Sequence, residues 1–522
     1  MSKTSAQLSR KRRSLQAAEH DDALLTAWSK TLRRSSARAA IFDVRGNVVR
    51  TFADIEADAA EFMRELGSFA AGEVIAFQIG NHPDWPSLFV ACLRKRLVVL
   101  PLEQTIAEEQ RRAIFATCRV AAVASITASS GAQSRHPVTF DTVGAAAVLG
   151  GRRVRVERSC RRGRTAAPTG PEASAATTAP PWADKQPSLL KLTSGTTAAP
   201  RAIRFRSEQL LADCENICDT MGITPSDVNF GVVPISHSYG FSNLLTPILV
   251  RGVALALSSD RMPRAILDGI AATRATVFAG MPVFYQSLCD LPEKLPLSAL
   301  RLCISAGAPL SVELARSFEA KSGLAIHSFY GSSECGGICY TRTPRPIPGF
   351  VGKPMCRVQV EFMDNGAASS AGHSGAIAVR STAVADGYFP EADEAKLGDG
   401  VFRPDDLLEK IADGYRIVGR VSDVINVAGK KVSPSQVEAE LLRCAGVREA
   451  VVFGRESSRR NEEVAACVVA NGVTEAELLA HCRARLSSWQ MPRRIFFRDG
   501  IPVNERGKIS RRELARLYAA DV

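Results

Sequence analysis

Short apolar runs alternate with longer stretches of helical periodicity over most of the chain. Near its start, residues 48–52 form a strand-like run that leads into a helical pattern at 53–66. The runs 73–79 and 97–102 have the length of buried strands, and a helical pattern at 86–93 separates them. Strands that alternate with helices in this way predict a mostly parallel sheet with helices on both of its faces.

The same alternation returns after residue 189. Strand-like runs follow at 228–233, 253–258, 276–279 and 300–305, and a smaller β-rich portion begins at 375–380.

Beyond residue 420 the pattern changes to a compact segment of mixed α and β character. Strand-like runs occupy 450–453 and 464–469, and a helical pattern occupies 437–442. Ser433 and Gln436 have the spacing of a capping box in front of that helix, with Pro434 at its first position.

These patterns predict an α/β fold in two domains. A large N-terminal domain of mixed and parallel sheets with flanking helices, including the small β-rich portion, is expected over residues 21–420, and a small α+β domain over 421–522. Residues 1–20 are polar and basic, which predicts a disordered tail. Residues 126–186 are rich in Ala, Ser, Thr, Pro and Arg, which predicts a low-complexity linker that is largely disordered.

The formal net charge of +12 changes this picture little once it is located. Residues 1–18 and 151–165 carry eleven of those twelve charges, so the rest of the chain is nearly neutral. A nucleic-acid-binding face needs basic residues spread over a folded surface, so we predict no nucleic-acid partner. No apolar stretch of 18 residues occurs, so we also predict no membrane span.

The chain has thirteen cysteines and none of the Cys-x2-Cys pairs typical of zinc sites. An odd number of scattered cysteines favours reduced thiols, and we predict a cytoplasmic location. No pattern in the sequence predicts the oligomeric state.

A hydroxyl-rich loop follows the apolar pair at 189–190. It offers many hydrogen-bond donors over a short arc, its glycine lets a ligand approach the backbone closely, and Arg201 adds a cation. Such a loop suits a polyphosphate, although a plain surface loop is the alternative. The loop residues that we expect to bind phosphates are Thr193, Ser194, Gly195, Thr196 and Thr197.

This loop resembles the phosphate-binding signature of the adenylate-forming enzymes, which include acyl-CoA synthetases, non-ribosomal adenylation domains and luciferases. The signature reads Thr-Ser-Gly-Thr-Thr-Gly-x-Pro-Lys-Gly. Its first five residues and Pro200 are present here, whereas Ala198, Arg201 and Ala202 depart from it. Arginine keeps the charge of the signature's lysine but presents a planar fork, so a different phosphate geometry is expected. The resemblance covers residues 189–514, and further motifs follow in the family's order.

Two of these motifs resemble the parts of the family's site around the acid and the adenine. His237 lies in a Pro-x-x-His-x-x-Gly stretch, and the resemblance implies a catalytic residue near the substrate carboxylate; a structural histidine is the alternative. The segment with Gly307 and Ala308 resembles the one against which adenine lies, where small residues let a flat base stack on the backbone.

Residues 329–334 resemble the family's Tyr-Gly-x-Thr-Glu motif. The resemblance implies that Tyr330 flanks the adenine, that Ser333 binds the α-phosphate, and that Glu334 is a catalytic residue that holds magnesium. Gly331 and Ser332 belong to the same nucleotide-binding motif. A carboxylate beside phosphates is consistent with a hard cation between them, although an acid in a surface loop is the alternative.

Asp406 aligns with an aspartate that binds both ribose hydroxyls, a role that suits a two-oxygen acceptor. Pro404 and Asp405 replace the family's Thr and Gly just before it. Arg420 aligns with a second ribose or phosphate contact.

The last motifs lie in the small domain. Ser422 stands at the hinge position, where the family has Asp or Lys, and Gly429 resembles a glycine that lines the pantetheine tunnel. Lys508, in Gly-Lys-Ile, resembles the catalytic lysine; a solvated lysine is the alternative. Lys508 and Gly429 lie on different segments and serve different steps, so the small domain is expected to be mobile and to rotate about Ser422.

The resemblance therefore implies ATP-dependent activation of a carboxylic acid to acyl-AMP with release of pyrophosphate, and then transfer to a thiol. The preferred interpretation is an AMP-forming acyl-CoA synthetase that uses ATP, Mg²⁺ and coenzyme A. One alternative is an enzyme that loads the phosphopantetheine of a carrier protein in trans. A second alternative is a non-catalytic nucleotide-binding homologue. The identity of the acid does not follow from the residues.

Overall fold

The computed structural model describes residues 22–126, 138–143, 182, 185–193, 200–292, 294–295, 297–364, 367–369, 373–427, 430–457, 461–502 and 510–518. The predicted tail at 1–20 lies outside these ranges, as does most of the predicted linker at 126–186. Two described parts of that linker are the strand β6 (Val138–Thr142) and Trp182, whose buried indole Nε1 donates to the backbone O of Gly72 at 2.7 Å. The tail and the linker therefore stay predictions.

The described residues up to 420, called the large part below, contain two sheets. The first of these sheets has seven strands. Its four central strands run parallel, as the alternation of apolar runs and helices predicts, and antiparallel strands complete both edges. In spatial order the strands are β19 (Gly387–Phe389), β8 (Ala202–Phe205), β7 (Leu189–Leu192), β4 (Val98–Pro101), β3 (Val74–Gln78), β5 (Val120–Ile126) and β6.

The second sheet has sixteen strands and changes character along its length. At one end β2 (Val48–Thr51) pairs antiparallel with β1 (Ala39–Phe42), and parallel pairs follow through β10 (Ala254–Leu257), β9 (Val228–Gly231), β11 (Val277–Gly280), β12 (Leu302–Ser305) and β13 (Ile326–Ser332). The other end is the β-rich portion. Its strands are β14 (Gly336–Tyr340), β15 (Phe350–Pro354), β23 (Gly414–Arg420), β22 (Asp406–Ile411), β18 (Ser374–Arg380), β16 (Gln359–Asp364), β17 (Ala367–Ser369), β20 (Leu397–Gly398) and β21 (Val401–Phe402).

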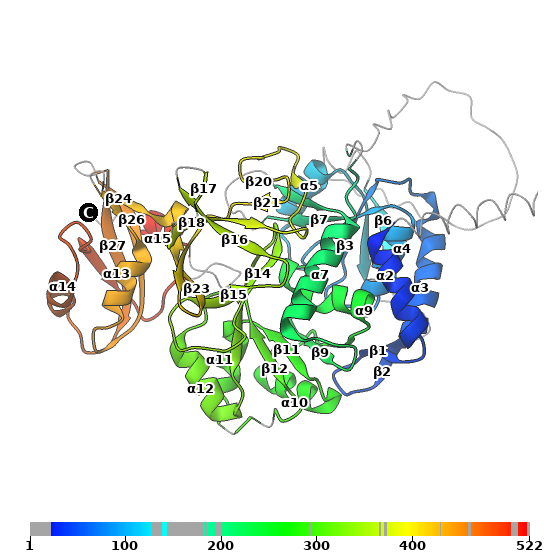
Figure 1. The fold of residues 1–522 in the computed structure, drawn as a ribbon, viewed down its shortest axis with the longest axis horizontal. Coiled ribbons are helices and arrows are strands. Elements are labelled where there is room, and N and C mark those ends of the chain that lie inside the picture. Colours follow the sequence, from blue (N-terminus) through cyan, green and yellow to red (C-terminus); the bar gives the residue numbers. More distant parts are fainter. Residues whose placement is uncertain are drawn as a thin grey trace, which may run out of the picture.

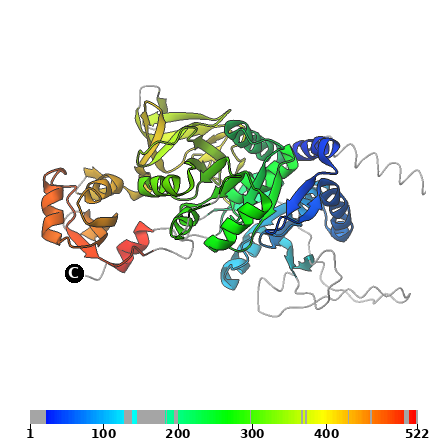
Figure 2. The same cartoon turned by 90° about the horizontal axis from the view of Figure 1, so that it is seen from below.

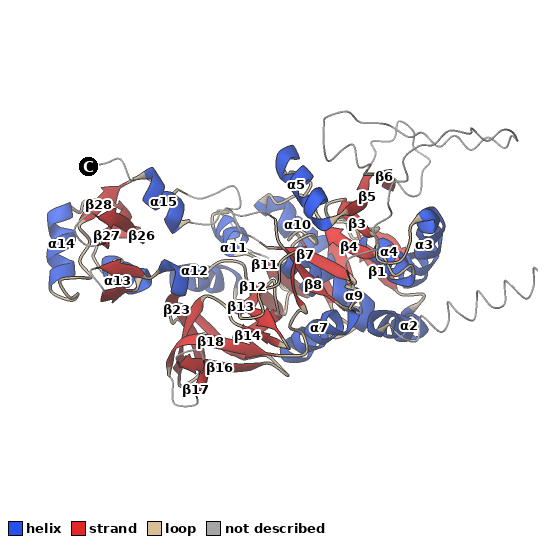
Figure 3. Ribbon diagram, turned by 90° about the horizontal axis from the view of Figure 1, so that it is seen from above, coloured by secondary structure: helices blue, strands red, loops and turns tan. Residues whose placement is uncertain are grey.

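Helices pack against both faces of the central strands (Figures 1 and 3). In β3, Ile75 and Phe77 belong to the main core cluster, whereas Val74 and Ala76 point to the opposite face, because successive side chains alternate across a strand. The main cluster takes side chains from α2 (Ala23–Ser35), α3 (Phe52–Glu65), η1 (Leu66–Ser68), α4 (Trp85–Arg94), α7 (Ser207–Met221), the π-helical η2 (Phe241–Leu245) and α9 (Thr246–Arg251). The outer faces are covered by α5 (Glu108–Cys118), α10 (Pro263–Thr273), α11 (Pro282–Cys289) and α12 (Val312–Ser322).

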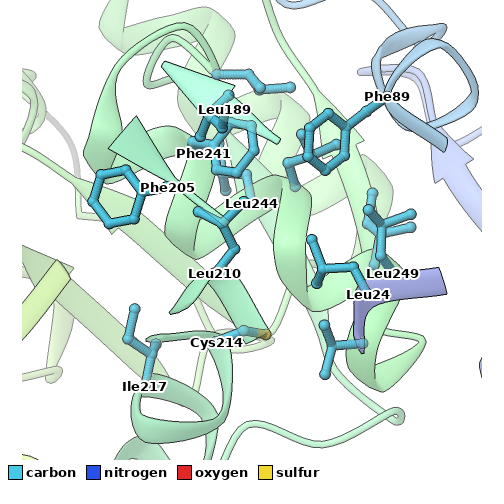
Figure 4. Packing of buried hydrophobic residues seen from close by; sticks show 14 of the residues in the cluster. Leu24, Phe89, Leu189, Phe205, Leu210, Cys214, Ile217, Phe241, Leu244 and Leu249 are labelled. Atoms are coloured by element: carbon cyan, nitrogen blue, oxygen red, sulfur yellow. The ribbon is translucent and has the colours of Figure 1, made fainter. Parts of the chain in front are cut away.

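Figure 4 shows how elements that are distant in sequence meet in the main cluster. Phe89 of α4 lies edge-on to Phe241 of η2, with ring centroids 5.3 Å apart, and Phe205 of β8 and Leu210 of α7 pack nearby. These side chains are buried completely or almost so, which fixes the two strands β7 and β8 against the helices beneath them.

The described residues after 420, called the small part below, are built around a separate five-stranded sheet. The small part stands at one end of the molecule (Figures 1 and 2). The turn η3 (Val421–Asp423) precedes it, α13 (Pro434–Leu441) and α14 (Glu475–Arg483) cover one face, and α15 (Arg511–Leu517) covers the other. The strands are β25 (Lys430–Val432), β24 (Ile425–Val427), β27 (Asn461–Ala470), β26 (Val447–Ser457) and, beside β27, β28 (Arg494–Phe497). The exact domain boundary at 420–421 stays a prediction.

Each strand-like run named from the sequence overlaps a strand, and the helix predicted at 437–442 overlaps α13. The capping box in front of that helix is wrong. Pro434 does open the helix, but Ser433 makes no side-chain cap; its hydroxyl donates to the backbone O of Val418 at 3.3 Å, because α13 packs against β23. None of the helices in the described part of the chain combines the length and the apolar character that crossing a bilayer requires.

Candidate functional site

The predicted phosphate loop joins two paired strands. β7 and β8 are antiparallel, and Thr193 N donates to Arg201 O at 3.0 Å, so these two residues close the base of the loop. Ser194, Gly195, Thr196 and Thr197 lie outside the described residues.

The side chain of Arg201 points toward β19, which pairs with β8 on the side opposite β7. Its guanidinium carbon lies 4.1 Å from the ring centroid of Tyr388, a cation–π distance. Nη2 donates to the backbone O of Glu391 at 3.4 Å and lies 4.0 Å from Asp393. The predicted loop cation is thus held from one side by the segment around β19.

The motif at 329–334 forms the end of β13 and the turn into β14. Both carboxylate oxygens of Glu334 accept a hydrogen bond, Oε2 from Ser332 Oγ and Oε1 from the hydroxyl of Tyr388 at 3.1 Å. Gly331 is required sterically, because a Cβ there would lie 2.6 Å from Gly336 O. The turn therefore presents a carboxylate of fixed orientation close to the base of the predicted phosphate loop.

A neighbouring segment is joined to this turn. Ser238 Oγ donates to Ser333 Oγ at 2.9 Å, which brings α8 (Ser238–Gly240) and the preceding His237 to the turn. His237 Nε2 lies 2.9 Å from Glu103 Oε1, and both side chains are partly exposed. Glu103 follows β4, and its pairing with His237 has no signature in the sequence because the two residues are more than a hundred positions apart.

The structure brings Tyr330, Asp406 and Arg420 together. The hydroxyl of Tyr330 donates to Asp406 Oδ2 at 2.8 Å, and Arg420 Nε donates to Oδ1 at 2.8 Å. Asp406 and Arg420 face each other across the antiparallel pair β22–β23. Burial, and then the charge of Asp406, raise the pKa of Tyr330, so its phenol stays a donor at neutral pH.

Gly307 and Ala308 follow the carboxyl end of β12, directly beside β13. Gly307 has a φ of +83°, which favours glycine over other residues. Because β12 and β13 are parallel, this segment lies at the same end of the two strands as Tyr330.

The two predicted residues of the small part, Gly429 and Lys508, lie outside the described residues. Their surroundings are described. Gly429 falls between the paired strands β24 and β25, and Lys508 falls three positions before the first residue of α15. That residue, Arg511, donates to Asp423 at 2.7 Å and to Glu438 at 2.8 and 3.0 Å.

One charged residue beside the site escaped sequence reasoning. The side chain of Lys191 in β7 is buried, with Nζ 4.5 Å from the ring centroid of Phe205 and 5.6 Å from that of Phe241. Nζ has no hydrogen-bond partner in the part of the chain that the structure describes. Burial lowers the pKa of Lys191, and the nearby Asp213 opposes that effect. The only sign of this buried charge in the sequence is a lysine inside an otherwise apolar strand.

Among the residues predicted from the sequence, Glu334 is the candidate ligand for magnesium. No group of three or more His, Cys, Asp or Glu side chains in the described residues has the arrangement of a metal site. Glu334 nevertheless fits this ion, because Mg²⁺ is usually bound by one or two carboxylates together with substrate phosphates. Each oxygen of Glu334 keeps acceptor capacity beyond its one hydrogen bond.

This architecture, with a large two-sheet part followed by a small five-stranded part, is that of the AMP-forming acid–CoA ligases. The chain belongs to the AMP-binding enzyme family: the profile of that family matches residues 28–389, and the profile of the AMP-binding enzyme C-terminal domain matches residues 436–508. The class of enzyme expected from the sequence is confirmed at this level.

Individual relatives agree with this assignment. The chain is 28% identical over 513 residues to a feruloyl-CoA synthase from Amycolatopsis, covering 95% of this chain and 99% of the relative. It is 27% identical over 474 residues to a probable CoA ligase from Humulus lupulus, covering 86% and 88%. The ATP-bound crystal structure of MatB from Rhodopseudomonas palustris has a similar fold, with a TM-score of 0.78 at 23% identity over 95% of this chain and 99% of that one.

Proposed function

We propose that this protein activates a carboxylic acid with ATP and then transfers the acyl group to the thiol of coenzyme A. In the first step a carboxylate oxygen attacks the α-phosphorus, the bond to the bridging oxygen breaks, and pyrophosphate leaves. In the second step the thiolate attacks the acyl carbonyl, the acyl–phosphate C–O bond breaks, and AMP leaves. Such chemistry needs positioning and charge stabilisation more than covalent help from the protein.

The observation that carries the proposal is that Tyr330 and Arg420 both donate hydrogen bonds to Asp406. Two donors hold the Asp406 carboxylate, one on each oxygen, and each oxygen retains a lone-pair direction for another donor. The two adjacent hydroxyls of a ribose could each donate a hydrogen bond to such a carboxylate. The ring of Tyr330 would then flank the adenine beside Gly307.

The other site residues would bind the phosphates, the metal and the acid. The loop with Thr193 and Arg201 would hold the β- and γ-phosphates, and Ser333 would bind the α-phosphate. Glu334 would hold Mg²⁺, which would offset the negative charge of the phosphates. His237 would lie at the entry of the acid, where Glu103 restrains its ring.

The small part would supply one residue to each step. Lys508 would offset charge on the carboxylate and the α-phosphate during adenylation, and Gly429 would line the path of the pantetheine thiol. We also propose a cytoplasmic location for this protein.

Pyrophosphate exchange with a panel of acids tests the first step, because labelled pyrophosphate enters ATP only when acyl-AMP forms reversibly. Loss of free thiol on addition of coenzyme A tests the second step. Pyrophosphate exchange together with acyl transfer to the phosphopantetheine thiol of a carrier protein, and no transfer to coenzyme A, would favour the carrier-loading alternative. Nucleotide binding without exchange for any acid would favour the non-catalytic homologue. The Asp406→Ala variant is the control that should bind the nucleotide more weakly.

A further inference from the structure

Tyr388 lies between the two charged groups that the proposed function assigns to the triphosphate. Its hydroxyl donates to Glu334 Oε1 at 3.1 Å, and the guanidinium of Arg201 lies 4.1 Å from the centroid of its ring. Tyr388 itself is only 4% exposed. Arg201 and Glu334 form no ion pair with each other in the described part of the chain.

The strand that carries Tyr388 is held firmly against the strand after the phosphate loop. In the β8–β19 pair Tyr388 stands opposite Ile203, which makes Arg201 its diagonal neighbour on the same face. Just before the strand, Asp386 accepts from Arg206 Nε at 2.7 Å and from Gln209 Nε2 at 2.8 Å. The backbone of Tyr388 therefore has little freedom, and its side chain is directed by the register.

The two contacts of Tyr388 have different consequences for the two charges. The hydroxyl fixes one oxygen of Glu334 while Ser332 fixes the other, so the carboxylate plane is set from both sides. The ring face supports Arg201 without neutralising it, since a cation–π contact leaves the guanidinium donors available. A direct Arg201–Glu334 pair would instead turn each group toward the other.

The Tyr388 phenol donates a hydrogen bond to the Glu334 carboxylate. A hydrogen bond of this kind to a metal-binding carboxylate orients the ligand and contributes to metal affinity.

We propose that Tyr388 is a positioning residue that keeps Arg201 and Glu334 apart and holds Glu334 ready for the metal of MgATP. This inference rests on the proposed function, because it takes Glu334 as the carboxylate that meets the metal. It assigns Tyr388 no contact with the reacting atoms.

The test is calorimetric binding of ATP with Mg²⁺ and with EDTA to wild-type protein and to three variants. Tyr388→Phe keeps the ring beside Arg201 and removes the hydroxyl, so MgATP should bind roughly 10- to 100-fold more weakly while metal-free ATP binds as in the wild type. Tyr388→Leu also removes the ring, so it should weaken both forms. Tyr285→Phe is the matched control, because it removes another buried hydroxyl, which donates to Ile304 O at 2.9 Å outside the predicted site.

Two results would overturn the inference alone: MgATP binding by Tyr388→Phe equal to that of the wild type, or an equal loss for MgATP and metal-free ATP. The latter would mean that the hydroxyl acts on the fold and not through Glu334. Failure of the wild-type protein to bind ATP in either form would overturn the proposed function, and this inference with it. Thermal unfolding of each variant checks that the protein used for the titration is folded.

Discussion

Arg511 offers a sharp test of how the segment with Lys508 is held. It is the first residue of α15, and its guanidinium reaches three elements of the small part: Nε donates to Val452 O at 2.9 Å, Nη1 to Asp423 at 2.7 Å and Nη2 to Glu438 at 2.8 and 3.0 Å. One side chain thus ties α15 to β26, α13 and the turn that precedes the small sheet.

The cost of removing this side chain follows from what it leaves behind. In Arg511→Ala the carboxylates of Asp423 and Glu438, 22% and 14% exposed, lose a shared cation, and Val452 O loses a donor. Breaking a fully buried ion pair costs about 3–5 kcal/mol. Because the Arg511 side chain is itself 28% exposed, solvent screening reduces that figure, and we expect about 2–3 kcal/mol. Arg511→Lys should recover only part of it, since an ammonium cannot reach three acceptors in fork geometry.

Hydrogen exchange read by mass spectrometry measures this loss locally. Amides of β26, α13 and α15 should exchange about 30- to 150-fold faster in Arg511→Ala, which is the same free energy at about 1.4 kcal/mol per tenfold. Amides of β3 and β7 should be unchanged and serve as an internal reference. Pyrophosphate exchange should fall as well, because Lys508 lies three positions before the anchor.

Arg516→Ala is the matched control, since Arg516 lies on the same helix and is exposed. Equal exchange rates in the two variants would refute the anchoring role of Arg511. Full recovery by Arg511→Lys would refute the importance of its fork geometry.

Four further predictions concern single residues. Lys508→Ala should abolish acyl-AMP formation and spare thioester formation from supplied acyl-AMP; equal loss in both assays would contradict its role. Asp406→Ala should weaken ATP binding by about 2–4 kcal/mol, and a shift of less than about threefold in the apparent ATP constant would contradict it. Ser422→Pro should spare pyrophosphate exchange and lower thioester synthesis by orders of magnitude, because proline fixes φ; wild-type rates in both would place the hinge elsewhere. The pKa of Lys191 is lowered by burial, so the unfolded chain binds more protons and stability should rise toward pH 10. Lys191→Met should therefore be more stable than the wild type at pH 7 by a larger margin than at pH 10 in urea unfolding, and an equal difference at both values would contradict the buried charge.

The strands of the central sheets were predictable because both of their faces are covered. A run such as 73–79 is apolar throughout, and β3 buries Ile75 toward one cluster and Val74 toward the other. The order of the strands was not predictable in the same way. The pairing of β19 with β8 joins residues almost two hundred positions apart, and an edge strand of three residues has no periodicity to recognise.

The site shows the same division. Tyr330, Glu334, Asp406 and Arg420 lie in motifs whose residue types and order resemble a known family, so they could be named before their contacts were known. Tyr388 could not, because its importance depends on the register of β8 and β19 and on a hydrogen bond across 54 positions. The wrong prediction of a capping box has a similar cause, since Ser433 donates to Val418 O across a tertiary contact that no local pattern encodes.

The contacts on either side of Ser422 limit where the small part can turn. Before it, Arg420 is paired with Asp406, and Val421 N donates to Asp405 O at 2.7 Å, so the chain is fixed to β22 up to that point. Directly after it, Asp423 is paired with Arg511 and so belongs to the small part. Only the backbone around residue 422 lies between these two anchored ends, so any rotation of the small part that preserves both pairs has to be taken up there. The same rotation would separate α13 from β23 and break the hydrogen bond from Ser433 to Val418 O, because those two elements lie on opposite sides of the turn.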